Sequence, residues 1–185
     1  LACMLGAIGR RGGGFGFGYG AEGYIGSDWR RFNWANFPKS YNPTRFAIPV
    51  SRISDALLNP GQVIQYDGQE ITYPHIDLIY WAGGNPFHHH QDLNRLVEAW
   101  RRPSTVIVNE PWWTPVAQWA DIVFPATTAL EREDFCMSSH DPYAHVMDKA
   151  LPVYGQSRSD HEIFIGLSRC LGLEGEFTEG KSEID

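Results

Sequence analysis

Three apolar runs separated by helix-like segments constrain the fold of this chain more than any other feature of its sequence. The runs are IDLIYWA (76–82), STVIVN (104–109) and DIVFPA (121–126), and they are rich in the β-branched and aromatic residues that strands favour. Strands that alternate with helices at this spacing are typical of a parallel sheet with right-handed crossovers. The sequence therefore predicts an α/β fold with a doubly wound, mainly parallel sheet.

The segments between the runs carry helix signals. After the first run, residues at helical spacing form one apolar stripe, which consists of Leu93, Leu96, Val97 and Trp100. After the second run, TPVAQWA (114–120) is a short helix candidate, because Thr114 can cap it and a proline takes the first helical position. Strand, helix, strand, helix and strand thus follow one another in order.

Two further elements are predicted before this unit. SRISDALLNPG (51–61) contains apolar residues at helical spacing, Ser51 can cap the helix, and an Asn-Pro-Gly sequence ends it. Two β-prone runs then flank Asp67 and Gly68, the dipeptide favoured in two-residue hairpin turns. The segment therefore predicts a helix followed by a β-hairpin.

A last helix is predicted within SDHEIFIGLSRCLG (159–172). Ser159 and Glu162 have the spacing of a capping box, and Gly172 is placed to cap the carboxyl end. The apolar stripe of this helix is Ile163, Leu167 and Leu171.

The first part of the chain, residues 1–48, has another character. Leu1 to Ile8 is a short apolar helix candidate, and glycines alternating with Phe15, Phe17 and Tyr19 follow it. This glycine-rich segment is either a flexible linker or a loop packed near a large ligand or another domain. We expect residues 1–48 to link to a missing amino-terminal part, and residues 49–185 to form the α/β domain of a longer polypeptide.

Composition excludes several classes of protein. The 185 residues include 15 basic and 22 acidic side chains, a net charge of −7, which argues against a nucleic-acid-binding surface. No apolar run reaches the roughly 18 residues of a membrane span. Cys3, Cys136 and Cys170 lack the spacing of a zinc ribbon or an iron–sulfur site. We expect them to be buried or half-buried thiols.

Polar residues follow each of the three predicted strands, at the sheet edge where α/β proteins bind ligands. Gly83 and Gly84 would let the backbone approach a bulky anionic group, and the helix N-terminus after them favours phosphate. Asn109 and Glu110 can hold ribose hydroxyls or purine nitrogens. The alternative is that these are only turn and cap residues, and the absence of GxGxxG gives no support to a nicotinamide site.

Two more residues belong to the same predicted edge. Thr114 places a second helix N-terminus and a hydroxyl group after the second strand. Asp134, in the segment ATTALERED after the third strand, could accept hydrogen bonds from guanine N1–H and N2–H. With the glycines and the Asn109–Glu110 pair, they predict a site for a nucleotide-like ligand.

The consecutive histidines His88, His89 and His90 do not predict a metal site. Chelation from a helix needs ligands at i and i+4, as in HExxH, and these histidines have no such partner. We expect one of them to donate to a phosphate and the others to be packed or exposed. No GxSxG motif and no cysteine in an activating context is present, so no catalytic or metal-ligating residue is predicted.

Four long segments of the chain resemble the molybdopterin oxidoreductases, in the subgroup of dimethyl sulfoxide, trimethylamine N-oxide and biotin sulfoxide reductases. They are IPVSRISDALLNPG, YPHIDLIYWAGGNPFHHHQDLNRLVEAW, VIVNEPWWTPVAQWADIVFPATTALERED and FTEGKSEI. Members of the family bind molybdenum through two molybdopterin guanine dinucleotides, and the matching segment is their Rossmann-like cofactor-binding domain. They reduce S-oxides or N-oxides by moving an oxo group to the metal, with two electrons and two protons releasing water.

The resemblance implies a role for each residue of the predicted edge. Gly83, Gly84, Asn85 and His89 would line the pyrophosphate and pterin side, and the nucleoside side would consist of Asn109, Glu110, Thr114 and Asp134. The family often has histidine at the position of Asn109 and Arg-His at Gln118-Trp119, so this chain departs from it there.

The resemblance also implies partners. They are the remaining domains of the same polypeptide, an S-oxide or N-oxide substrate and an electron-donor protein, in bacterial cytoplasm or periplasm. The molybdenum ligand lies in the family's amino-terminal part, so we expect this chain to be inactive alone. The alternatives are a stand-alone α/β nucleotide-binding or interaction module and a histidine-rich metal binder.

Overall fold

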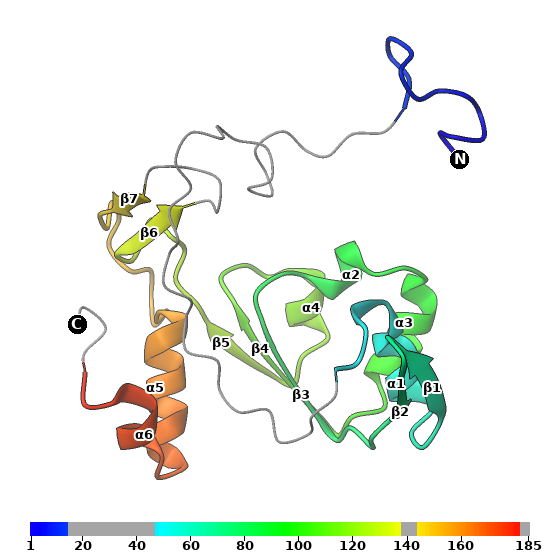
Figure 1. Ribbon diagram of the computed structural model, residues 1–185. Coiled ribbons are helices and arrows are strands. Elements are labelled where there is room, and N and C mark those ends of the chain that lie inside the picture. The colour runs from blue at the N-terminus through cyan, green and yellow to red at the C-terminus, as the bar shows by residue number, and fades with distance from the viewer. Residues whose placement is uncertain (15–46, 138–143, 182–185) are drawn as a thin grey trace. The chain divides into compact units, whose positions relative to one another are not determined.

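A computed structural model describes residues 1–14, 47–137 and 144–181 (Figure 1). The chain divides into two compact units. The smaller unit comprises Leu1–Ser40 and Asp134–Met147, and the larger unit comprises Tyr41–Glu133 and Asp148–Asp185. The larger unit contains the predicted sheet.

Three parallel strands form the centre of the larger unit. They are β3 (Leu78–Ala82), β4 (Thr105–Glu110) and β5 (Ile122–Pro125), in the order β3-β4-β5 (Figure 1). All three predicted strands are therefore confirmed, as is a mixed α/β fold. The order is sequential, so the reversal of strand order that defines a doubly wound sheet is not found among the described strands.

One face of the sheet carries the hydrophobic core. Helices α1 (Ile53–Leu58), α2 (Pro86–His89), α3 (Leu93–Trp100) and α4 (Pro115–Gln118) contribute to it. Because side chains alternate along a strand, Val106 and Val108 of β4 point to this face and are buried. The buried residues of the core are Leu57, Phe87, Leu96, Ala99, Trp100, Val106, Val108 and Val116.

The opposite face of the sheet lies against α5 (Asp160–Cys170). Tyr80 points to this side, and its ring lies 5.5 Å from that of Phe164, measured between centroids. The predicted capping box is confirmed: Glu162 N donates to Ser159 Oγ over 3.1 Å, and Ser159 N donates to Glu162 Oε2 over 2.9 Å.

The predicted glycine cap at the carboxyl end of α5 is confirmed. Gly172 follows Leu171 with a left-handed φ of 73°, and the capping hydrogen bonds run from Gly172 N to the carbonyl oxygen of Arg169 over 3.1 Å and from Leu173 N to that of Ser168 over 2.8 Å. Leu171 is 72% exposed, so the predicted apolar stripe is wrong at its last residue. Helix α6 (Glu174–Thr178) comes next, and Phe177 on it is 46% exposed.

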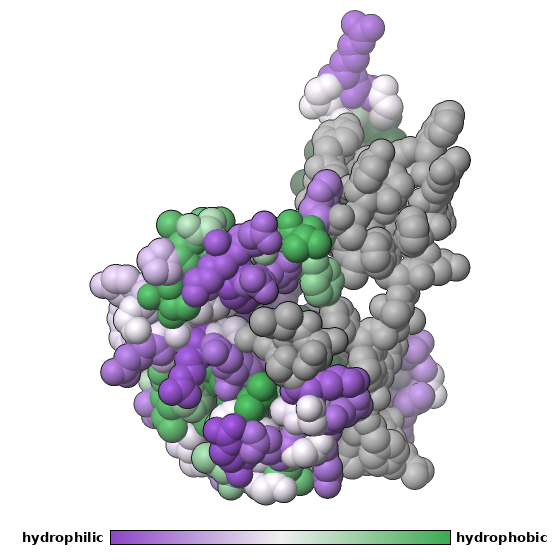
Figure 2. Space-filling model, turned by 90° about the vertical axis from the view of Figure 1, so that its left-hand side faces the viewer, coloured by the Kyte–Doolittle hydropathy of each residue, from purple (hydrophilic) through white to green (hydrophobic). Residues whose placement is uncertain are grey.

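Figure 2 views the molecule from the left of Figure 1 and shows apolar patches between polar ones on that face.

The predicted β-hairpin is also confirmed. Strands β1 (Val63–Tyr66) and β2 (Gln69–Thr72) are antiparallel, and Tyr66 pairs with Gln69 across the turn. Asp67 and Gly68 have φ of 51° and 72°, as both central residues of a type I′ turn require.

The helix before the hairpin begins later than the sequence predicts. A 3-10 helix, η1 (Val50–Arg52), contains Ser51 and precedes α1. Neither η1 nor α1 has a side-chain cap, so the prediction of a Ser51 cap is wrong. Asp55 of α1 accepts a hydrogen bond from Arg52 over 2.6 Å and pairs with Arg95 of α3. This carboxylate therefore joins α1 to α3.

The smaller unit has little regular structure among its described residues. Residues 1–14 form successive turns, and the helix predicted for Leu1 to Ile8 is absent there. Gly6 and Gly9 have φ of 61° and 79°, outside the right-handed helical region, which explains the difference. Strands β6 (Asp134–Met137) and β7 (Ala144–Met147) form an antiparallel pair. Phe15, Phe17 and Tyr19 lie outside the described residues.

The structure also answers two questions raised by the composition, the state of the cysteines and the presence of a membrane span. Cys3, Cys136 and Cys170 are free and exposed, so the prediction of buried or half-buried thiols is wrong. Among the described residues, no helix has both the length and the apolar character that crossing a membrane requires.

Candidate functional site

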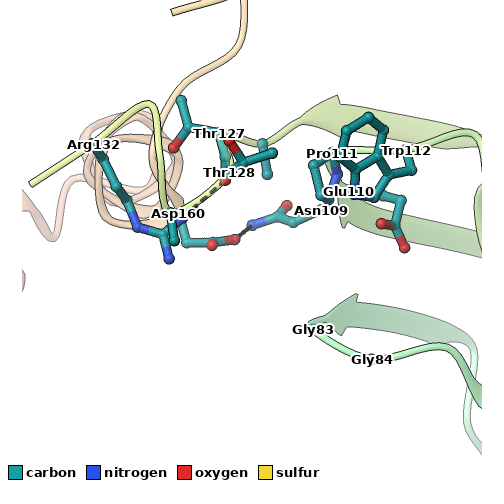
Figure 3. Close-up of a pocket in the computed structure, with 12 residues that line it drawn as sticks. Gly83, Gly84, Asn109, Glu110, Pro111, Trp112, Thr127, Thr128, Arg132 and Asp160 are labelled. Carbon is teal, nitrogen blue, oxygen red and sulfur yellow. Dashed lines mark hydrogen bonds between the residues drawn. The ribbon is translucent and has the colours of Figure 1, made fainter. Parts of the chain in front are cut away.

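A cavity of about 380 Å³ opens at the carboxyl ends of the sheet strands. Residues from the ends of β3, β4 and β5 and from the start of α5 surround it (Figure 3). The lining consists of Gly83, Gly84, Asn109, Glu110, Pro111, Trp112, Ala126, Thr127, Thr128, Ala129, Arg132 and Asp160. The predicted ligand-binding edge of the sheet thus coincides with a cavity.

The turn after β3 forms one wall. Gly83 and Gly84 have φ of 82° and 71°, a left-handed conformation that favours glycine at both positions. A Cβ atom built on either residue would meet nothing within 4 Å, so the space over this turn is open. Trp81 Nε1 donates to the carbonyl oxygen of Gly84 over 3.1 Å and holds the turn in place.

Asn109, near the end of β4, links Tyr80 of β3 to Asp160 of α5 through side-chain hydrogen bonds. Tyr80 O–H donates to Asn109 Oδ1 over 2.7 Å, and Asn109 Nδ2 donates to Asp160 Oδ1 over 2.9 Å. Burial raises the pKa of Tyr80, the hydrogen bond to Asn109 lowers it and the charge of Asp160 raises it, with a net upward shift. Tyr80 is therefore a neutral hydrogen-bond donor at physiological pH.

Glu110, the last residue of β4, also accepts a side-chain hydrogen bond. Thr114 Oγ1 donates to Glu110 Oε2 over 2.9 Å. Thr114 makes no side-chain cap for α4, so the predicted capping role is wrong. A hydroxyl that donates to a carboxylate forms a charge-assisted bond, which is stronger than a bond between neutral groups.

The loop after β5 forms the third wall. Thr127 is 4% exposed, and within residues 1–14, 47–137 and 144–181 its Oγ1 atom is buried with no hydrogen-bond partner. Arg132 Nη1 donates to the carbonyl oxygen of Thr127 over 2.8 Å. Arg158, just before α5, bonds this loop through its backbone, because Thr127 N donates to its carbonyl oxygen over 2.9 Å.

One carboxylate fixes the shape of the same loop. Glu131 Oε2 accepts from Thr128 N over 2.8 Å and from Thr128 Oγ1 over 2.9 Å. Its Oε1 atom accepts from Tyr154 N over 2.9 Å. These hydrogen bonds, led by the one from Thr128 N, lower the pKa of Glu131. The loop is therefore held by an ionised side chain that does not itself line the cavity.

Four of the eight predicted site residues line the cavity, namely Gly83, Gly84, Asn109 and Glu110. Thr114 does not line the cavity but donates a hydrogen bond to Glu110. Asp134 begins β6 in the smaller unit, where its Oδ1 accepts from Phe135 N over 2.9 Å. The role of these residues in binding a ligand stays a prediction.

The two predicted residues of α2 have other neighbours. Asn85 is 8% exposed, and its Oδ1 caps α2 by accepting from Phe87 N over 3.1 Å. Its Nδ2 atom is buried without a partner among the described residues. His89 is exposed on α2, and neither residue lines the cavity. Helix α2 has four residues and ends at His90, whose backbone is extended, and α3 begins after Asp92.

Four polar lining residues were not predicted: Thr127, Thr128, Arg132 and Asp160. The first three lie in ATTALERED. The sequence predicted that this segment reaches the sheet edge, but it did not predict that these three residues line the site. Asp160 is 51 residues from Asn109 along the chain, and the local sequence marks it only as the first residue of a helix.

The charged groups of the cavity indicate which ligands it suits. Glu110 and Asp160 supply two carboxylates, and Arg132 supplies one guanidinium. This set favours a polar ligand with several N–H or O–H groups. Among the described residues, no three His, Cys, Asp or Glu side chains form a group that could hold a metal ion.

A second, larger cavity of about 860 Å³ lies between the end of β5 and α5. Its lining includes Phe124, Pro125, Ile163, Leu167 and Cys170, and is mainly apolar. Size alone would favour it as a binding site. The smaller cavity is the better candidate, because its polar groups converge from three strand ends and a helix start.

Comparisons with known proteins identify the family of the chain. The family model described as molybdopterin oxidoreductase matches residues 1–170. Over its whole length the chain is 47% identical to biotin sulfoxide reductase from Cereibacter sphaeroides and covers 25% of that protein. It is likewise 45% identical to trimethylamine-N-oxide reductase from Haemophilus influenzae and covers 24% of that protein. The chain therefore spans about a quarter of the length of these relatives.

A solved structure shares the fold. Acetylene hydratase from Pelobacter acetylenicus superposes with a TM-score of 0.58 over 72% of this chain and 17% of its own. The two sequences are 18% identical, so this likeness concerns the fold alone.

Proposed function

The chain belongs to the molybdopterin oxidoreductase family, and on this premise we propose that it binds part of a molybdenum–molybdopterin cofactor within a larger reductase. One observation carries the proposal: a cavity at the carboxyl edge of a parallel sheet, bounded by a Gly-Gly turn, Asn109 and Glu110. In α/β proteins this edge is where nucleotides bind. Membership of the family implies the cofactor, and we propose that the cavity at the carboxyl edge of the sheet binds part of it.

The polar groups of the cavity fit the nucleotide end of a guanine dinucleotide form of that cofactor. Thr127 Oγ1 is buried and unpaired among the described residues, and a polar ligand would satisfy it. The open Gly83–Gly84 turn leaves room for the backbone to approach a pyrophosphate. The nucleoside would face Asn109 and Glu110, and Thr114 would act through its hydrogen bond to Glu110.

The reaction that follows is the reduction of an S-oxide or N-oxide. When bound, the cofactor supplies oxygen-atom and electron transfer, and the oxide, two electrons and two protons give the reduced product and water. The residues of this chain bind and orient the cofactor. The relatives named as biotin sulfoxide and trimethylamine-N-oxide reductases support this class of substrate. An electron-donor protein would supply the electrons.

Residues 49–185 would then be the α/β domain, Rossmann-like and doubly wound once the remaining polypeptide is present. Residues 1–48 would link it to the part that carries the molybdenum ligand. Helices on both faces of the sheet support this arrangement, with α3 on one face and α5 on the other. Without those partners, we expect the chain alone to be inactive.

A segment exchange tests the proposal. The matching quarter of the Cereibacter sphaeroides biotin sulfoxide reductase is replaced by this chain. We expect the hybrid to retain molybdenum, to release GMP on acid hydrolysis and to reduce biotin sulfoxide. A folded hybrid that contains no molybdenum and releases no GMP would contradict the proposal and favour a stand-alone module.

A further inference from the structure

We propose that the β6–β7 hairpin binds a soft metal ion, of the class of Cu(I), through Cys136, His145 and Met147. These side chains would supply a thiolate, an imidazole nitrogen and a thioether sulfur. The hairpin belongs to the smaller unit, whereas the residues of the sheet-edge cavity all belong to the larger unit, so the two sites share no residue.

The pairing register of the hairpin places the three side chains on one face. Strands β6 and β7 are antiparallel, and Cys136 pairs directly with His145 (Figure 1). Side chains of directly opposed residues point to the same face, with their Cβ atoms about 4.5–5.5 Å apart. Met147 is two residues beyond His145 on the same strand, so the alternation of side chains returns it to that face.

Met147 is also within reach of the cysteine. It pairs directly with Asp134, two residues before Cys136, and is therefore a diagonal neighbour of that thiol. Diagonal neighbours on a sheet face are about 7–8 Å apart, a distance that long side chains can span. A single ion can therefore contact a ligand from each strand and a second ligand from β7.

The face is accessible to an ion from solvent. Cys136 has a free thiol and is exposed, His145 is exposed and Met147 is half-buried. Free cysteine is among the most buried types of residue, so packing does not account for Cys136. Cys3 and Cys170 are exposed as well, but neither lies in a strand with a histidine opposite.

The donor atoms decide which ion the face suits. Thiolate and thioether sulfur are soft ligands that select Cu(I), and imidazole also suits copper. Zinc is bound by cysteine, histidine and carboxylates. Among the described residues, no three side chains of those types form a group that could hold a metal ion. The thioether of Met147 is the third ligand here, and it favours Cu(I) over Zn²⁺.

Binding exchanges a proton for the ion. Metal ligands must be deprotonated, so the S–H bond of Cys136 breaks as the bond from sulfur to Cu(I) forms, and the proton passes to solvent. His145 and Met147 bind through neutral atoms. No electron is transferred, and the step needs no reactant besides the ion.

Titration of the complete 185-residue chain with Cu(I), against the colorimetric chelator bicinchoninic acid, tests this site. We expect Cys136→Ser, His145→Asn and Met147→Leu each to weaken Cu(I) binding about tenfold or more. Loss of a group that only supports a ligand already costs about 10–100-fold in metal affinity, and these variants remove the ligands themselves. Zn²⁺ affinity should not change in Met147→Leu.

The chain offers a matched control for each ligand. Cys170→Ser removes an exposed thiol of α5, Met4→Leu removes a methionine that is 88% exposed, and His75→Asn removes an exposed imidazole. None of these residues belongs to the hairpin, so each control should leave Cu(I) affinity unchanged. Circular dichroism checks that every variant is folded.

A second readout locates the ion. Cu(I) is diamagnetic, so the imidazole resonances of His145 in the isotope-labelled chain should move on saturation, whereas those of His75 should not. Movement of His75 and His145 alike would indicate binding throughout the surface and would overturn the site.

The titrations can contradict the site in other ways. Losses confined to Cys136→Ser, or to Cys136→Ser and His145→Asn, would overturn it, because Met147 would then not be a ligand. Equal losses for Cys136→Ser and Cys170→Ser would overturn it too, as would absence of Cu(I) binding by the original chain at micromolar concentration. The proposed function would stand in each case, because its test measures molybdenum and GMP.

Discussion

The Gly83 turn allows the cost of a substitution to the fold to be separated from its cost to ligand binding. Gly83 has a φ of 82° and Gly61, in the turn before β1, has a φ of 86°. A Cβ atom added at either position meets nothing within 4 Å. Alanine therefore imposes the same backbone strain at both sites, about 1–2 kcal/mol for a left-handed residue. Of these two glycines, Gly83 lines the cavity and Gly61 does not.

We predict that Gly83→Ala and Gly61→Ala lower the melting temperature equally. For a chain of this length, 1 kcal/mol corresponds to roughly 2–4 °C. Thermal unfolding followed by circular dichroism measures this shift, and GMP titration measures binding. Gly83→Ala should weaken GMP binding about tenfold or more, because the methyl group occupies space that the ligand needs, whereas Gly61→Ala should not change it. Equal GMP affinities for the two variants would refute the assignment of the Gly83 turn to the site.

Three other substitutions test the fold and the loop around the cavity. Leu96→Ala should lower the free energy of unfolding by about 2–5 kcal/mol in urea titrations, because Leu96 is fully buried in the core; a loss below 1 kcal/mol would contradict that packing. The pKa of Asp55 is lowered, chiefly by its hydrogen bond from Arg52, so the carboxylate stabilises the fold above its unfolded pKa of about 3.9. This stability is lost as the pH falls through the lower folded pKa. Asp55→Asn should therefore cost up to about 1 kcal/mol at pH 7 and nothing below both pKa values, and an equal cost at both pH values would contradict the pairing. Glu131→Gln should speed hydrogen exchange at the Thr128 amide and leave that of Val108 unchanged, since the carboxylate accepts from Thr128 N; equal effects at both amides would indicate general unfolding.

The sheet and the hairpin could be predicted because their signals are local. β-branched runs mark β4 and β5, and Asp67-Gly68 specifies a turn in which both residues have positive φ. The capping box of α5 is equally local, since Ser159 and Glu162 are three residues apart. Each of these depends on neighbours in the chain and on little else.

The predictions that failed depend on competing contacts. Ser51 and Thr114 are good capping residues, but Thr114 donates to Glu110 and Ser51 lies within a 3-10 helix. The apolar segment from Leu1 to Ile8 has helix-forming residues, yet Gly6 adopts a left-handed conformation. Local propensity favours these structures only weakly, so other interactions of a few tenths of a kcal/mol or more can decide against them.

The candidate site was predicted in part for a related reason. The strand order predicts which chain segments meet at one edge, so Gly83 and Asn109 were found together. Asp160 enters the site from a helix that comes after two further strands in sequence, and no local pattern reports that approach. The unpaired hydroxyl of Thr127 is visible only once burial is known.

Mapping of GMP-induced amide chemical shifts on the isotope-labelled chain tests the central claim most directly. The sheet-edge site predicts that the amide resonances of Gly83, Gly84 and Thr127 move together with a single affinity. Shifts confined to the apolar cavity around Ile163 and Leu167, or no shifts at millimolar GMP, would contradict it.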